Sequence, residues 1–88
     1  MMTTVKLAST YEFGHDKYGP LKYEIMEEVS TGQSIFYFII YIQREIIAYG
    51  DTQPYRFWAI LTQGYRCQAG TLDGAEQEAW NHFTQNYP

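Results

Sequence analysis

The sequence is poor in cysteine and in basic residues, and both shortages exclude classes of protein. Cys67 is the only cysteine, so the chain cannot form an internal disulfide, and we expect a small, partly buried strand residue rather than a reactive thiol. Six Lys and Arg against ten Asp and Glu give a net charge of −4 at pH 7. Attachment to a nucleic-acid backbone or to an anionic membrane depends on clustered Lys and Arg, and the sequence has no such cluster. Neither nucleic acid nor a membrane is therefore expected as a partner.

A long hydrophobic run is also missing. The most apolar stretch, residues 35–42, stops at Gln43, Arg44 and Glu45, whereas a membrane-spanning helix needs about 20 apolar residues. The chain shows no basic and apolar leader and no Asn-x-Ser/Thr acceptor. Together these absences predict a cytoplasmic protein.

Residues that commonly carry chemistry are few. The two histidines are His15 and His82, and His82 is predicted to lie on the polar side of a helix, so we expect no set of convergent metal ligands. The sequence has no nucleophile motif and no glycine-rich phosphate loop. Glu24 and Glu28 would share one face of a strand at about 13 Å, which is too far for a catalytic carboxylate pair. We therefore expect no enzymatic activity, no catalytic residue, no metal and no cofactor.

Aromatic residues, by contrast, are abundant. Nine Tyr, five Phe and two Trp make up 18% of a chain of 88 residues. A single domain of this size buries only roughly 60–65% of the surface that its unfolded form exposes. Some of the rings must therefore lie at the surface, which is the first indication of an interaction face.

The first twenty residues are polar and contain glycine. One short strand is expected over residues 4–8, and the rest of residues 1–20 is expected to be loop-like or part of a short edge strand. Residues 21–29 alternate between apolar and polar residues, as strands do, but Glu27 interrupts the alternation, which predicts either an early strand end or a bulge near Met26. A turn centred on Gly32 follows.

The apolar stretch after this turn is rich in Ile and aromatic residues, which favours strands over a helix. We expect a strand over residues 35–42, a short connection at 43–45, an extended piece over 46–49 and a loop over 50–55. The segment YRFWAIL predicts the next strand. Gly64 then marks either a tight turn or a bulge within one longer strand.

The periodicity changes after Gly70. Asp73, followed three residues later by Glu76, predicts the N-terminal capping box of a helix. The apolar residues of this segment fall on one helical face: Leu72, Ala75, Ala79, Trp80, Phe83 and Tyr87. Strands first and one helix last predict a single α+β domain over residues 1–88, a small antiparallel meander of three to five strands with one C-terminal helix packed on one face.

One helix cannot cover both faces of a sheet. The even-numbered residues of 35–42 are predicted to face the core beneath the helix, and so are Phe57, Ala59 and Leu61 of the later strand. Thr62 is predicted to lie on the opposite face of the sheet. Tyr, Trp and Arg are enriched at binding hot spots, and the opposite face is rich in them. Six residues of that face are predicted to contact a partner: Tyr37, Ile39, Tyr41, Arg56, Trp58 and Ile60.

These patterns predict a small non-enzymatic protein-interaction module, a regulator, adaptor or inhibitor, whose partner is another protein or a second copy in a homodimer. Other hypotheses stay open. Residues 1–20 or the loop 50–55 could fold across the aromatic face and bury it. A small acidic domain could also be a phage or mobile-element inhibitor of a host nucleic-acid-binding enzyme. The last alternatives are a small enzyme that unites His15, Asp16, Glu24 and Cys67, or an aromatic surface that stacks on single-stranded nucleic acid.

Overall fold

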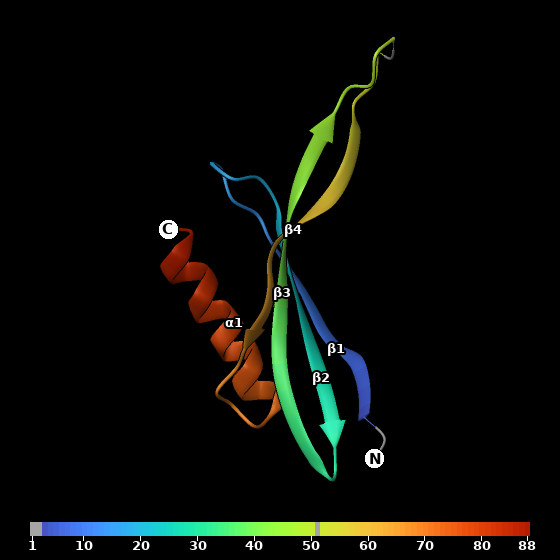
Figure 1. Ribbon diagram of the computed structural model, residues 1–88. Coiled ribbons are helices and arrows are strands. Elements are labelled where there is room, and N and C mark those ends of the chain that lie inside the picture. The colour runs from blue at the N-terminus through green and yellow to red at the C-terminus, as the bar shows by residue number, and fades with distance from the viewer. Residues whose placement is uncertain (1–2, 51) are drawn as a thin grey trace.

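The structure is a four-stranded antiparallel sheet with one helix packed on one of its faces (Figure 1). The computed structural model describes residues 3–50 and 52–88. The strands are adjacent in space in the same order as in sequence, β1-β2-β3-β4. Their bounds are β1 Thr3–Phe13, β2 Leu21–Ser30, β3 Gln33–Ile46 and β4 Tyr55–Arg66, and the helix α1 spans Leu72–Asn86. The predicted α+β meander with a single C-terminal helix is confirmed.

The N-terminal strand is longer than the sequence pattern indicated. β1 has 11 residues, rather than the five expected over residues 4–8, and lies at one edge of the sheet. It pairs with β2 from Thr3 opposite Ser30 to Phe13 opposite Leu21, with one irregularity between Leu7 and Ser9. Residues 1 and 2, part of the segment expected to be loop-like or an edge strand, lie outside the described residues.

Glu27 does not end or distort β2, so the early end or bulge expected near Met26 is wrong. β2 pairs with β3 without interruption from Leu21 to Ser30. The Glu27 carboxylate accepts a hydrogen bond from Ser34 Oγ at 2.7 Å and lies 3.5 Å from Lys6 Nζ. These partners satisfy its charge on the helix side of the sheet, so an acidic residue is tolerated at an apolar register position.

The turn between β2 and β3 is the one that the sequence predicts. Thr31 and Gly32 have φ values of +53° and +74°, which is the left-handed pair typical of a two-residue hairpin turn. Glycine adopts this conformation without steric cost, and the twist of such a turn matches that of the flanking strands. The turn therefore fixes the register of β2 against β3.

β3 is a single strand of 14 residues, so the connection predicted at residues 43–45 is wrong. Gln43, Arg44 and Glu45 pair with residues of β4. Here the β3–β4 hairpin extends past α1 as a two-stranded arm, which we define as residues 43–57 and which fills the upper part of Figure 1. Polar residues are accepted in this arm because no helix packs on it. Asp51, expected in the loop at its tip, lies outside the described residues.

β4 is also one long strand, of 12 residues, and it contains two bulges. Gly64, with a φ of +78°, lies in the bulge between Thr62 and Tyr65, so the bulge is correct and the tight turn is wrong. Leu61 has no register partner and forms the second bulge. The extra residue leaves Leu61 exposed and places Thr62 opposite Ile40 on the helix side, which corrects the predicted positions of both.

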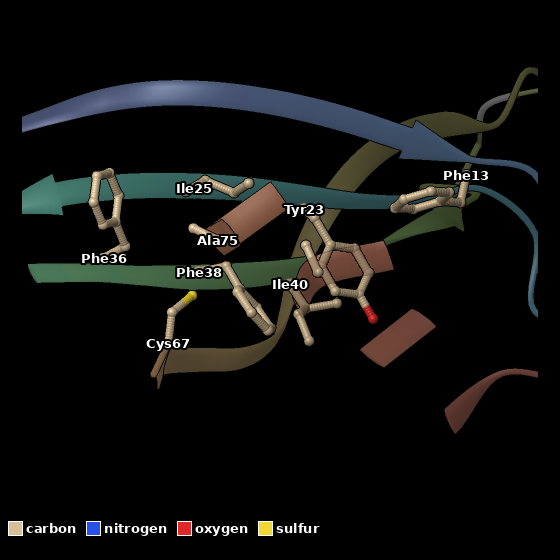
Figure 2. Close-up of a cluster of buried hydrophobic side chains, with 9 residues drawn as sticks. Phe13, Tyr23, Ile25, Phe36, Phe38, Ile40, Cys67 and Ala75 are labelled. Atoms are coloured by element: carbon tan, nitrogen blue, oxygen red, sulfur yellow. The ribbon is translucent and has the colours of Figure 1, made fainter. Parts of the chain in front are cut away.

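The core lies between α1 and the sheet. As predicted, the even-numbered residues of β3 face the helix, and Figure 2 shows Phe38 and Ile40 beside Tyr23 and Ile25 of β2. Fully burying one such side chain contributes about 1.5–3 kcal/mol. Leu72, Phe83 and Tyr87 of the predicted helical face pack against the buried cluster, which consists of Phe13, Tyr23, Ile25, Phe36, Phe38, Ile40, Cys67, Ala75 and Ala79.

The helix begins one residue after Thr71, and the predicted capping box at Asp73 is wrong. Thr71 is the N-cap, and its Oγ1 accepts a hydrogen bond from the Gly74 N–H at 3.2 Å. Asp73 lies in the first turn instead, where its charge is favourable near the helix N-terminus. Among the described residues no helix has both the length and the apolar character needed to cross a membrane.

Candidate functional site

The six residues predicted to contact a partner share the face of the sheet that α1 does not cover. In β3 the odd-numbered residues lie on this face, because the even-numbered ones are buried beneath the helix. Cross-strand pairing adds residues of β4, since Ile60 lies opposite Tyr41 and Trp58 lies opposite Gln43. We call the six residues the open-face strip: Tyr37, Ile39, Tyr41, Arg56, Trp58 and Ile60.

No other described segment of the chain covers the open-face strip. Residues 3–13, which could have folded across it, instead form β1 at the sheet edge. Gly50 and residues 52–54 lie at the far end of the arm (Figure 1). Ile60 is 56% exposed, and the rings of Tyr37, Tyr41 and Trp58 are half-buried against their neighbours on the sheet. For the described residues, the hypothesis that the chain buries its own aromatic face is therefore wrong.

Lys22 contacts two rings of the strip, those of Tyr41 and Trp58. It lies on β2 opposite Tyr41, and its Nζ is 4.7 Å from the centroid of the Tyr41 ring and 4.7 Å from that of Trp58. Cation–π contacts at exposed sites contribute about 0.5–1 kcal/mol each. They hold both rings in a defined orientation. The sequence alone could not show that the face of β2 that carries Lys22 also carries the strip, because cross-strand register decides this.

Charged residues lie within the strip and beside it. Glu24 accepts a hydrogen bond from the Tyr41 hydroxyl, and this bond raises the pKa of Tyr41. On the other side Arg56 Nε donates to Glu45 Oε1 at 2.9 Å in an exposed ion pair. Arg66 lies opposite Tyr37 on β4. The face thus has an apolar and aromatic centre, with carboxylates toward β2 and arginines along β4.

A hollow lies beside one end of the strip. It has a volume of about 320 Å³ and is lined by Glu28, Ile35, Tyr37, Gly64 and Arg66. Gly64 contributes no side chain, so the bulge in β4 leaves space that a partner side chain can enter. Two of its lining residues, Tyr37 and Arg66, are of types enriched at protein interfaces.

The apolar surface continues from the strip to β1. Cross-strand pairing places Met26 beside Tyr37 and Leu7 beside Met26. Val5 is 49% exposed and Leu7 is 53% exposed, so this edge of the face is apolar as well. The sequence did not predict this extension, because residues 1–20 were expected to be largely loop-like.

Known proteins provide no assignment for this surface. Comparisons with models of protein families, with curated proteins and with solved structures find no match to this chain. The candidate functions must therefore be weighed on the geometry and chemistry of the chain's own residues.

The residues of the alternative enzyme site do not come together. Glu24 lies on the open face, whereas Cys67 is buried on the helix side, where its N–H donates to the Phe36 carbonyl at 2.8 Å. Burial raises the pKa of the Cys67 thiol to about 11, so it is protonated at neutral pH. His15 lies in the β1–β2 connection, with Nε2 3.1 Å from the Pro88 oxygen. The part of the chain that the structure describes has no group of three His, Cys, Asp or Glu side chains able to hold a metal ion.

His82 faces the sheet, which corrects its predicted place on the polar side of the helix. Its Nδ1 lies 2.8 Å from the Tyr23 hydroxyl, and its ring packs edge-on against Phe38 and Tyr65. Burial lowers the pKa of the imidazole. The hydrogen bond explains why a histidine fits here, because the buried Tyr23 hydroxyl needs a polar partner. This histidine supports the core rather than a surface site.

Proposed function

We propose that this chain is a small non-enzymatic protein-interaction module that binds a partner protein through the open-face strip, as a regulator, adaptor or inhibitor. The observation that carries the proposal is an aromatic and aliphatic strip on a sheet face that no described segment covers. Burial of apolar surface is favourable by about 25 cal/mol per Å². Tyr, Trp and Arg are also the residue types that dominate binding hot spots.

The rigidity of the strip supports the same proposal. Its residues lie on two paired strands, and Lys22 contacts both Tyr41 and Trp58. Side chains that are already ordered lose less conformational entropy on binding, and each immobilised flexible side chain otherwise costs about 0.5–1.5 kcal/mol. The strip is therefore preorganised for a partner.

The charges of the open face favour a protein over nucleic acid. Glu24 and Glu28 lie next to the strip on β2, and the whole chain carries a net charge of −4. Phosphates would be repelled by these carboxylates, and counterion release needs several clustered cations. A protein surface with mixed charges can instead pair with both the carboxylates and Arg56.

The decisive experiment compares the wild-type chain with Trp58→Ala and Tyr41→Ala in partner capture from the native host, followed by calorimetric titration of the captured protein. Each substitution is expected to weaken binding by roughly 30-fold or more, because hot-spot truncations cost about 2 kcal/mol or more. The thermal unfolding midpoint should change little, since neither ring belongs to the buried cluster. Sedimentation of the purified chain alone shows whether the partner is a second copy.

Phe57→Ala is the matched control. Phe57 is 46% exposed and adjacent to Trp58 on β4, but its side chain lies on the other face of the sheet. The substitution Phe57→Ala should therefore leave partner binding unchanged. Equal loss of binding from Phe57→Ala, or a large loss of stability from Trp58→Ala and Tyr41→Ala, would show that the open-face strip is not the binding surface.

A further inference from the structure

A second surface, on the helix side of the sheet, has the chemistry of a cation site. A groove of about 260 Å³ lies between β1 and α1, far more room than a single water needs. Tyr11 reaches it because it pairs with the buried Tyr23 and so faces the helix side. The groove is lined by Tyr11, Phe13, Asp73, Glu76, Gln77 and Trp80.

Three aromatic rings line the groove, with Tyr11 and Phe13 from β1 and Trp80 from α1. The centroids of Phe13 and Trp80 are 5.4 Å apart, and those of Tyr11 and Phe13 are 6.2 Å apart in a stacked arrangement. Phe13 is buried, but Trp80 is 53% exposed and Tyr11 is 39% exposed. Trp80 was predicted to pack with the apolar face of the helix; in the structure its side chain is largely exposed, and its ring lies against that of Phe13. A cation within about 6 Å of a ring centroid is attracted to its face, most strongly by Trp.

Two carboxylates of α1, those of Asp73 and Glu76, line the same groove, and their charges are not neutralised by a basic side chain. Glu76 Oε2 accepts hydrogen bonds from Ser9 Oγ at 2.8 Å and from Tyr11 Oη at 2.7 Å. These bonds fix the carboxylate against β1 and hold its pKa below the usual range. In the described chain the ion pairs are Lys6 with Glu27 and Arg56 with Glu45, so neither Asp73 nor Glu76 has a basic partner. The helix N-terminus contributes only about half a positive charge, which is less than these two carboxylates carry.

This combination selects an organic cation over other ligands. A hard metal ion needs six or more oxygen ligands, and aromatic rings provide none. An anion would meet two carboxylates, and a purely apolar ligand would leave both charges uncompensated beside it. A guanidinium or an alkylammonium matches both kinds of group, because it stacks on or packs against the rings while donating hydrogen bonds to the carboxylates.

We propose that this groove binds the side chain of an Arg or Lys from a basic segment of a partner protein, with Trp80 and Tyr11 against the side chain and Asp73 and Glu76 as its counter-ions. β1 is an edge strand, and its outer edge pairs with no described strand, so an extended segment can lie alongside the groove. The site is independent of the open-face strip, which lies on the other side of the sheet.

The two tryptophans of the chain allow a direct test. Trp80 lines the groove and Trp58 lies in the open-face strip, so their indole N–H signals in a proton–nitrogen NMR spectrum report the two surfaces separately. Blocked pentapeptides with a central Arg, Lys or Glu between glycines serve as probes. The Arg and Lys peptides should shift the Trp80 signal in a saturable manner and leave the Trp58 signal in place, whereas the Glu peptide should shift neither.

Charge variants of nearly the same shape complete the test. The double variant Asp73→Asn, Glu76→Gln should weaken Arg-peptide binding by roughly tenfold or more, because both counter-ions are lost. Gln retains an oxygen for Ser9 and Tyr11, and a thermal melt checks that the fold persists. Glu12→Gln, which removes an exposed carboxylate of β1 outside the groove, should leave binding unchanged. An unmoved Trp80 signal, an equal response to the Glu peptide, or full binding by the double variant would overturn the proposal.

Discussion

At the scale of single residues, the contact between Tyr23 and His82 shows how this small core accommodates polar groups. Both side chains come from the helix–sheet interface, and their hydrogen bond measures 2.8 Å. In the described residues no buried side-chain nitrogen or oxygen lacks a partner. The aromatic neighbours of the imidazole are Tyr23, Phe38, Tyr65 and Tyr87. These rings carry no formal charge at neutral pH, so the neutral imidazole is the form that fits.

The partly buried imidazole of His82 makes the stability depend on pH. Burial lowers the pKa of His82 below its ordinary value of 6.5, so the unfolded chain binds this proton more tightly than the folded one. The free energy of unfolding should therefore be undiminished above about pH 6.5 and should fall as the pH drops from there toward the folded-state pKa of His82. Urea unfolding at several pH values between about 8 and 5 measures this slope.

His82→Gln should flatten that slope, because it removes the titrating group and keeps an acceptor for Tyr23. The carboxylates of Glu27 and Glu76 affect the free energy of unfolding in a separate, more acidic pH range. Hydrogen bonds from Ser34 and from Tyr11 lower the pKa values of Glu27 and Glu76, so their contribution is lost only as the pH falls below about their ordinary value of 4.5. An unchanged slope between pH 8 and 5 in His82→Gln would show that another group controls acid stability.

At the scale of elements, the sequence predicted what local patterns determine. The helical periodicity, the turn at Gly32 and the even–odd alternation of β3 depend on neighbours within a few residues. The wrong predictions concern features that tertiary contacts determine. Residues 43–45 looked like a break because polar residues interrupt an apolar run, yet they pair with β4 in an arm that needs no apolar face. Asp73 looked like the N-cap, but the N-cap position is occupied by Thr71, and Asp73 lies in the first turn of the helix.

The same division applies to the candidate sites. The open-face strip followed from the alternation in two strands, and the bulge at Leu61 lies beyond its residues in β4. Lys22 and Leu7 were missed because their proximity to the strip depends on cross-strand register, which a single sequence does not contain. The groove was missed for a similar reason. Glu76 and Trp80 meet Tyr11 only because β1 extends to Phe13, whereas the sequence indicated a strand over residues 4–8.

The β4–α1 connection provides a prediction in which packing overrides helix propensity. A Cβ at Gly74 would lie 2.6 Å from Ala69 Cβ and 3.2 Å from Thr71 Oγ1. Propensity alone predicts that Gly74→Ala stabilises by about 1 kcal/mol. We expect instead a loss of about 1–3 kcal/mol in the free energy of unfolding, because the connection must move to relieve the overlap. Chemical denaturation measures the change.

Gln85→Ala is the control for this prediction. Gln85 is exposed in the last turn of the helix, so the substitution tests propensity without the overlap. It should be neutral or stabilise by a few tenths of a kcal/mol. If Gly74→Ala is stabilising as well, the connection does not pack against the first turn as the structure shows.

At the scale of the whole molecule, much of the exposed apolar surface lies on the arm, away from the core. The Cα atoms extend over 53 × 32 × 15 Å, and the arm accounts for one end of the long axis (Figure 1). The buried cluster lies between the helix and the sheet. Several large apolar side chains lie on or at the tip of the arm and are exposed: Ile46, Ile47, Tyr49, Tyr55 and Phe57. The stability of the fold should therefore depend on the helix-covered half alone.

Excision of the arm tip tests this separation. Glu45 and Arg56 are register partners, so residues 46–55 can be replaced by Asn-Gly, which forms a two-residue hairpin turn. The melting midpoint should stay within about 4–8 °C of the parent, the shift that 1 kcal/mol produces in a domain of this size, because no excised residue belongs to the buried cluster. Solution scattering should show a shorter molecule, and partner binding through the retained Tyr41 and Trp58 should persist. A far larger fall in the melting midpoint would mean that the tip packs against the core in solution.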